Sequence, residues 1–257
     1  VFGMCFVILV PFLTTLLREK SNWRTTGFLA VLAAYYGTVT SMSSGPLMCL
    51  VVFCGCAVLI KKPELVKPVL VLIAVIIVAA EIGSNRHFYH LIGYLALGSS
   101  ATWYRARLFE LAVMDLPRYW AFGIGFSDPG WGPLLDGRSY TDVCNQYILL
   151  ALRHGALAAA LFVAMIGAAI ARLRRAYLTQ RPAPIADDAW YLGSMVIGMG
   201  LALYSVGLLG AMETLFYLML GVIAGPLFEP KRTIRVIVSR TPAAQPAPAA
   251  PDMTPGE

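Results

Sequence analysis

The sequence predicts an all-α polytopic membrane protein of about seven transmembrane helices, with one large outer loop that contains short amphipathic helices. Three observations lead to this fold class. Hydrophobic residues make up 58% of the 257 residues and charged residues only 13%, whereas about a quarter of a soluble domain is charged. Seven apolar runs divide the chain, and Lys and Arg fall in short clusters between them.

The apolar runs have about the length that crosses a bilayer as a helix, roughly 17–25 residues. Two of them, 26–42 and 45–60, are short and are separated by only a few residues. Either they form a tight helical hairpin, or one of the two is a broken helix. The seven runs are 1–17, 26–42, 45–60, 68–84, 146–171, 189–209 and 212–228.

The basic residues orient these runs. Fourteen of the twenty Lys and Arg residues lie in four segments, 18–25, 61–67, 172–188 and 229–257. These segments alternate along the chain so that all four can be cytoplasmic, as the positive-inside rule requires. Residues 85–145 then lie on the outer face. The net charge of +6 reflects this orientation signal, and we expect no nucleic acid as a partner.

The chain therefore divides into four parts: transmembrane helices one to four (1–84), the outer loop (85–145), transmembrane helices five to seven (146–228) and a cytoplasmic tail (229–257). The tail is rich in Pro and Ala and is predicted to be disordered. The first residues have no basic region, so no signal peptide is predicted there. We expect the chain to be the C-terminal portion of a longer membrane protein.

The outer loop is unusually long for a connection between two spans, and it is rich in aromatic residues. Aromatic side chains anchor at membrane interfaces, so we expect the loop to lie on or dip into the outer leaflet. Within it, residues 101–116 predict a helix that ends before Pro117. Its apolar face is predicted to hold Leu108, Leu111, Ala112 and Met114.

Three arginines of the loop, Arg105, Arg107 and Arg118, lie on the side that the positive-inside rule disfavours. A guanidinium holds phosphate through a planar fork of donors, so a lipid-linked pyrophosphate is the ligand we expect, above all at Arg105. The alternative is that the arginines bind lipid headgroups or pair with nearby acids. Arg107 and Glu110 have the i, i+3 spacing of a helical ion pair.

The loop enters the fifth apolar run through Asp142-Val143-Cys144-Asn145. Asn145 is predicted to cap the helix that follows, whose outward N-terminus favours anions. Arg153 and His154 lie about two turns into this run. Ionisable side chains at such depth are costly and indicate function, unless they reach back to the interface.

Several of these segments, in this order, resemble a known family. They are Trp103-Tyr104-Arg105, the element from Pro117 to Gly125 with Phe122-Gly123-Ile124-Gly125, and Asn145-x-Tyr147-Ile148-Leu149 ending in Arg153-His154-Gly155. Residues 40–46 are similar to a short outward turn of the same family. Together with the topology, residues 84–165 resemble the O-antigen ligase and polysaccharide polymerase family of bacterial membrane proteins.

The resemblance implies a metal-independent glycosyltransferase of lipopolysaccharide or exopolysaccharide biosynthesis in the bacterial inner membrane. The loop 85–145 would then be periplasmic and the C-terminus cytoplasmic. The implied donor is a saccharide on a polyprenyl-pyrophosphate carrier such as undecaprenyl pyrophosphate, and the acceptor is a glycan or a lipid A core sugar. Membrane lipids are further partners, and no cofactor is implied.

The resemblance also implies roles for single residues. Arginines of the family hold the pyrophosphate, and the candidates here are Arg105, Arg107, Arg118 and Arg153. The catalytic candidates are Asp142, Cys144 and Asn145. Many members have His where this chain has Cys144 and Arg where it has Ser44. The general base is therefore open between Asp142, Glu81 and Glu213, and His154 is a further candidate.

Two alternative functions remain from the sequence: a non-catalytic membrane subunit of a polysaccharide assembly complex, and a transporter. A transporter predicts discontinuous spans, charge at the membrane midplane and internal repeats. The sequence contains no evident repeat and little charge within the apolar runs. No metal is expected, because the i, i+3 pair His87 and His90 has no evident further ligands.

Overall fold

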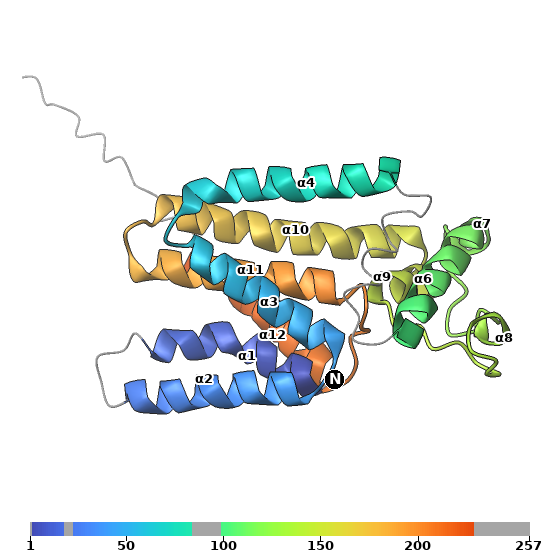
Figure 1. The fold of residues 1–257 in the computed structure, drawn as a ribbon, viewed down its shortest axis with the longest axis horizontal. Helices are drawn as coiled ribbons and strands as arrows, with labels where there is room; N and C mark the ends of the chain where they lie inside the picture. Colours follow the sequence, from blue (N-terminus) through green and yellow to red (C-terminus); the bar gives the residue numbers. More distant parts are fainter. Residues whose placement is uncertain (1, 18–22, 84–98, 229–257) are drawn as a thin grey trace, which may run out of the picture.

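The computed structural model describes residues 2–17, 23–83 and 99–228, and these residues form helices without any strand (Figure 1). Long helices run side by side, and short helices gather at one end, which we call the α6 end. The long helices are α1 (Phe2–Leu16), α2 (Trp23–Thr40), α3 (Ser44–Leu59), α4 (Val66–Gly83), α10 (Ala156–Thr179), α11 (Pro184–Ala202) and α12 (Ala211–Ala224). The α6 end carries α6 (Ser99–Met114), α7 (Leu116–Tyr119), α8 (Gly132–Leu135) and α9 (Gln146–His154).

Among the residues that the structure describes, two helical stretches are long and apolar enough to cross a membrane. One is Pro63–Gly83, 21 residues that comprise the 3-10 turn η1 (Pro63–Leu65) and α4, and the other is α10 with 24 residues. Helices α1, α3 and α12 are also apolar but have only 15, 16 and 14 residues. The predicted all-helical class is confirmed, whereas the seven-span topology and the tail, which lies outside the described residues, stay predictions.

Helix α11 lies at the centre of the bundle, where it packs against α1, α3 and α10. Its side chains Met195, Val196 and Met199 are fully buried. At Gly198 the helix approaches α3 so closely that a Cβ would lie 3.0 Å from the carbonyl oxygen of Cys49. Small residues at such crossings let helices pack through their backbones, as is common in membrane bundles.

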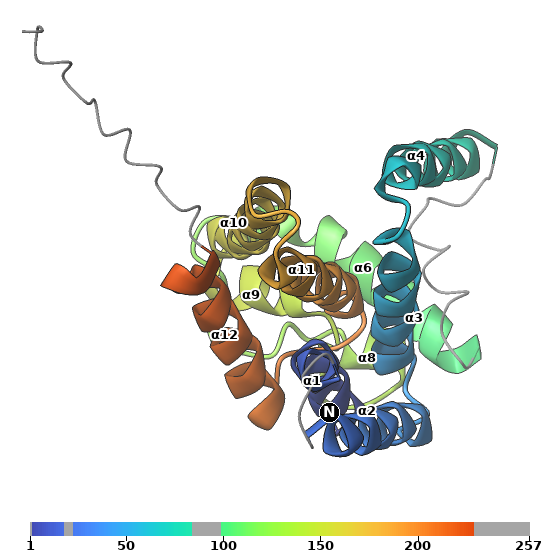
Figure 2. The same cartoon turned by 90° about the vertical axis from the view of Figure 1, so that its left-hand side faces the viewer.

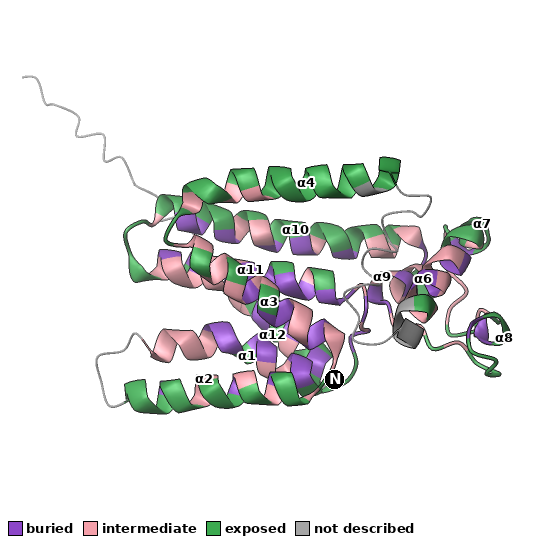
Figure 3. Cartoon of the chain, viewed as in Figure 1, coloured by how far each residue is buried: buried purple, intermediate pink, exposed green. Residues whose placement is uncertain are grey.

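Helix α4, in contrast to α11, is not buried by the other helices. It is apolar on all sides, yet none of its described side chains is buried (Figure 3). Figure 2 shows it standing apart from the other long helices. Residues such as Leu70, Val71 and Ile82 are 60%, 61% and 82% exposed. A helix that is hydrophobic all round is stable when it is surrounded by protein or by lipid.

The short apolar runs 26–42 and 45–60 form two helices, α2 and α3, and neither helix is broken. A turn of three residues joins them, and Met42 in this turn has a positive φ of 46°. From the turn the two helices diverge, because α2 packs along α1 while α3 packs along α11 (Figures 1 and 2).

The predicted continuous run 146–171 is wrong, because the structure divides it at Gly155 into α9 and α10. Gly155 has a φ of +88°, and a Cβ there would collide with the carbonyl of Ala121. The chain bends where another segment presses against it. Arg153 and His154 therefore precede the long apolar helix α10 instead of lying inside it.

The short helices at the α6 end share a small apolar core of their own, separate from that of the bundle. Leu108, Leu111 and Ala112 of α6 belong to it, as predicted, together with Trp131 and Leu152. Met114 does not, and is 69% exposed. Six residues after Leu108 a helix has turned by 600°, so Met114 points away from the face that Leu108 occupies.

Candidate functional site

A pocket of about 600 Å³ lies at the α6 end, between α6 and the segment that follows α8. Three of the residues predicted from the sequence line it together: Arg105, Asp142 and Cys144. The other lining residues are Trp103, Tyr104, Leu135, Asp136 and Arg138. The pocket thus combines two cations, two carboxylates and aromatic walls, a composition suited to a polar anionic ligand.

Arg105 joins this pocket to the helical bundle. Its Nη1 donates a hydrogen bond of 3.0 Å to the Oγ of Ser44, at the start of α3. On its other side the guanidinium lies beside the Cys144 thiol. Arg105 therefore contacts both Ser44 and Cys144.

The Cys144 thiol lies mostly out of solvent, and burial raises its pKa. The positive charge of Arg105 opposes this shift, and the nearby Asp142 carboxylate adds to it, but the net direction is upward. A raised thiol pKa keeps the proton on sulfur at neutral pH. Cys144 is therefore a neutral group of the pocket wall and not a proton acceptor.

Asp142 is exposed and faces the same pocket. Its backbone carbonyl accepts a hydrogen bond of 2.8 Å from the Tyr104 hydroxyl, which ties the segment to α6. Burial, together with the charges of Asp142, Cys144 and Asp136, raises the pKa of Tyr104 to about 12. Tyr104 therefore stays a hydrogen-bond donor, and the pocket residues that carry a carboxylate are Asp142 and Asp136.

The loop that carries Asp142 is fixed by the Asp128 carboxylate. Asp128 accepts hydrogen bonds from the backbone N–H of Gly130 at 2.6 Å and of Thr141 at 2.7 Å, and from the Thr141 hydroxyl at 2.9 Å. These bonds favour the ionised form and lower the pKa of Asp128. The indole of Trp131 donates to Asp115 at 2.7 Å, which attaches the same loop to α6.

Asn145 is the cap of α9, as predicted. Its Oδ1 accepts hydrogen bonds from the backbone N–H groups of Tyr147 at 2.9 Å and Ile148 at 3.1 Å. It is almost fully buried and is not among the residues that line the pocket. Its position is therefore explained by the local structure, and it holds the neighbouring Cys144 and Asp142 at the end of α9.

The structure separates the other predicted arginines from the pocket. Arg107 pairs with Glu110 at 2.9 Å on the surface of α6, the alternative that its spacing suggested. Arg118 is exposed on α7. Arg153 lies at the end of α9 with its guanidinium 5.0 Å from the ring centre of Phe126, next to the exposed His154.

The alternative bases Glu81 and Glu213 also lie outside the pocket lining. Glu81 is exposed in the last turn of α4, and Glu213 is exposed in the first turn of α12. Of the three carboxylates proposed as the base, only Asp142 shares a pocket with Arg105.

Sequence analysis missed two charged residues of the pocket, Asp136 and Arg138. Arg138 is a further outer-loop arginine, and its Nε forms an ion pair of 3.1 Å with Asp136. Its Nη1 donates to the Tyr140 hydroxyl at 3.3 Å. Arg138 could have been predicted as a site residue, because it lies in the predicted outer loop, where the positive-inside rule disfavours arginine, as Arg105 does.

The glycines of the segment Phe122-Gly123-Ile124-Gly125 serve a structural contact. Ile124 N donates to the carbonyl of Leu152 at 2.6 Å, and Ala156 N donates to the carbonyl of Trp120 at 2.7 Å. Gly123 has a φ of +76° and lies where a Cβ would meet the backbone of Arg153. This segment therefore fills the break between α9 and α10.

Within the described residues, no three His, Cys, Asp or Glu side chains come together as metal ligands. His87 and His90 lie outside the described residues. In comparisons with known proteins, no family model, no curated protein and no solved structure matches the chain. The described residues thus form helices without strands. Two of these helices are able to cross a membrane, and a pocket of mixed charge lies at the α6 end.

Proposed function

We propose that the chain is a membrane-embedded glycosyltransferase that moves a glycan from a polyprenyl-pyrophosphate carrier to a sugar hydroxyl at the outer face of a bacterial inner membrane. The observation that carries this proposal is the pocket in which Arg105, held against Ser44, lies together with Asp142. A positioned cation beside a carboxylate is what displacement of a pyrophosphate by a hydroxyl requires.

The proposed chemistry assigns one task to each group. The acceptor hydroxyl attacks the anomeric carbon of the donor sugar, and Asp142 accepts the proton of that hydroxyl. The bond between the sugar and the pyrophosphate oxygen breaks at the same time. Arg105 stabilises the negative charge that develops on the leaving pyrophosphate, which stays attached to its lipid.

The proposed topology has seven spans, formed by α1, α2, α3, α4, α10, α11 and α12, with α9 outside. The four basic segments are then cytoplasmic and the α6 end is periplasmic. Two observations support it: α4 and α10 are long enough to span, and α4 has the all-round apolar surface of a helix in lipid. Part of the catalytic site would then lie where a lipid carrier presents its headgroup.

The break between α9 and α10 does not favour a transporter. Discontinuous helices of transporters lie near the midplane of the membrane. Helix α10 is long enough to span the membrane without α9, so the break between the two helices lies at the N-terminal end of α10. The segment that contains Trp120 and Ile124 fills the break there. Arg153 and His154 belong to α9, which the proposed topology places outside the membrane.

The first experiment compares the glycans of a deletion strain with those of strains that carry single variants. We expect Arg105→Ala to lower glycan transfer by about 100-fold or more, as loss of one transition-state donor does. Arg107→Ala is the matched control, because it removes the same side chain from the same helix outside the pocket; we expect at least a third of the activity to remain. Normal glycan chains in an Arg105→Ala strain with normal protein level would contradict the site.

Further variants separate charge from packing. Ser44→Ala removes the hydrogen bond to Arg105 but leaves its charge, so we expect a smaller loss than with Arg105→Ala. Asp142→Asn removes the base and Glu110→Gln is its control. Full activity in both Arg105→Ala and Asp142→Asn, together with co-purification of assembly proteins, would support the non-catalytic subunit instead.

The glycan profile of the deletion strain also separates the two reactions. Loss of long chains from lipid A, with polymer still on its carrier, identifies a ligase. Single repeat units on the core, or loss of a secreted polymer while lipopolysaccharide is intact, identify a polymerase. An unchanged profile of every surface glycan contradicts the proposed function.

A further inference from the structure

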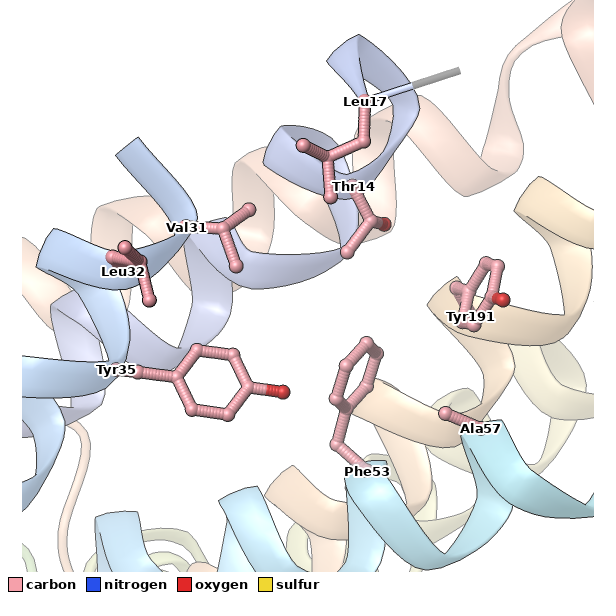
Figure 4. Close-up of a pocket in the computed structure, with 8 residues that line it drawn as sticks. All are labelled: Thr14, Leu17, Val31, Leu32, Tyr35, Phe53, Ala57 and Tyr191. Atoms are coloured by element: carbon pink, nitrogen blue, oxygen red, sulfur yellow. The ribbon is translucent and has the colours of Figure 1, made fainter. Parts of the chain in front are cut away.

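A second cavity lies in the other half of the bundle and has no part in the proposed reaction. It measures about 410 Å³ and is enclosed by α1, α2, α3 and α11 (Figure 4). Figure 4 shows Tyr35 of α2 pointing toward Phe53 of α3, with Leu17, the residue that follows α1, at the top of the view and Tyr191 of α11 at the right. We call this cavity the α2–α3 wedge.

The wedge exists because α2 and α3 belong to different helix pairs. Helix α2 is held against α1, where a Cβ on Gly27 would lie only 2.8 Å from the Cβ of Leu16. Helix α3 is held against α11 at Gly198. The hydroxyl of Tyr35 and the Sγ of Cys54, 3.3 Å apart, form one bridge between α2 and α3. Neither helix can close the space without leaving its partner.

The walls of the wedge are suited to hydrocarbon. Most lining side chains are apolar, and the hydroxyls of Thr14 and Tyr35 already have partners within the protein. Thr14 donates to the carbonyl of Pro11 at 2.6 Å, and Tyr35 contacts Cys54. Water enters a cavity only where several polar partners are available, and an empty cavity loses the contacts of its walls. Inside a bilayer, a lipid acyl chain is the apolar group available to fill the wedge.

The open end of the wedge is cationic. A neighbouring hollow of about 420 Å³, which shares Leu17 with the wedge, is lined by Arg24, Thr25 and Phe28. Lys61 and Lys62, both exposed, follow the end of α3 at the same end of the bundle. An apolar space that opens beside basic side chains is complementary to an amphiphile with a negative headgroup.

We propose that the α2–α3 wedge binds one anionic phospholipid, with an acyl chain in the wedge and the headgroup phosphate beside Arg24. The inference rests on the proposed membrane location and not on the transfer reaction. In the proposed topology the lipid comes from the cytoplasmic leaflet, at the opposite end of the bundle from Arg105. It would stiffen the α1–α2 pair against α3 and α11.

Native mass spectrometry of the full chain, purified in detergent and incubated with defined lipids, tests the proposal. We expect one phosphatidylglycerol to remain bound about tenfold more tightly than phosphatidylcholine, as one charge-assisted contact would give. Arg24→Gln should abolish this preference. Ala57→Phe fills the wedge from α3 and should abolish retention of both lipids.

Two controls carry the same changes elsewhere. Arg174→Gln removes an exposed arginine of α10, and Ala164→Phe enlarges an exposed alanine of the same helix; both should retain phosphatidylglycerol as the wild type does. Equal retention in Arg24→Gln and wild type, or equal loss in the controls, would overturn the proposal in favour of non-selective lipid around the bundle. Should Ala57→Phe fail to fold, the Arg24→Gln comparison still decides.

The same preparation separates this inference from the proposed membrane location. A chain that stays monodisperse without detergent contradicts the membrane location itself. A chain that requires detergent but shows no preference between the two lipids contradicts the lipid site alone. A bound polypeptide in place of the lipid would show that a protein partner fills the wedge.

Discussion

Arg105 connects three segments that are far apart in the sequence: the start of α3, helix α6 and the segment before α9. Arg107, Arg138 and Arg153 instead make local contacts, with Glu110, with Asp136 and with the ring of Phe126. Single side chains of one type therefore have different roles here, and each depends on the neighbours that the fold supplies.

Cys144 gives the first prediction at the scale of single residues. Because burial raises the pKa of its thiol, we expect maleimide to label it slowly at pH 7 and faster only above the pH at which an exposed thiol reacts. Arg105→Ala removes the charge that opposes the shift, so labelling should move to still higher pH. Mass spectrometry of the peptide that contains Cys144 measures both rates. Labelling at neutral pH as fast as that of an exposed thiol would refute the buried, neutral thiol.

Asn145 gives the second. Asn145→Ala removes the acceptor of two backbone N–H groups and should lower the free energy of unfolding by about 1 kcal/mol, the usual value of a helix cap. Asn145→Asp keeps an acceptor oxygen and should cost less. Thermal unfolding in detergent measures the two variants. If both lose the same stability, the side chain does more than cap the helix.

At the scale of elements, the junction of α9 and α10 depends on Gly155. Its φ of +88° is unfavourable for other residues, and any Cβ would collide with Ala121. We expect Gly155→Ala to lower the free energy of unfolding by at least about 1–3 kcal/mol. Gly167→Ala is the matched control, since Gly167 lies within α10 with nothing near its Cβ position and should gain up to about 1 kcal/mol.

Thermal unfolding of these two glycine variants decides between the observed break and the continuous helix expected from the apolar pattern. Equal stabilisation by both alanines would mean that the run 146–171 is one helix. Hydrogen exchange at Ile124 and Ala156 gives a second measure, because their N–H groups donate across the junction and should exchange faster in Gly155→Ala only.

At the scale of the whole molecule, the distribution of basic residues predicts which parts face outward. Alkaline phosphatase fused after residue 130 should be active, because this enzyme folds in the periplasm. Fusions after residues 62 and 180 should be inactive, since both lie in basic segments. Similar activity at all three positions would contradict the proposed orientation, and inactivity at 130 alone would reverse it.

The sequence by itself determined features that depend on neighbours along the chain. Apolar composition and periodicity predicted helices, the polar residue before α9 predicted its cap, and i, i+3 spacing predicted the pair of Arg107 with Glu110. Met114 shows the limit of such patterns, because an apolar residue was assigned to a helix face without regard to its angular position.

Only the tertiary structure decided which distant residues meet. It placed Arg105 against Ser44, 61 positions away, and gathered Arg138 and Asp142 around the same pocket. It broke the fifth apolar run at Gly155, because a segment 34 residues earlier presses against that glycine. It also left a cavity between α2 and α3. The physical reason is common to all three: spacing along a helix is local, whereas contacts between helices depend on packing that no single segment encodes.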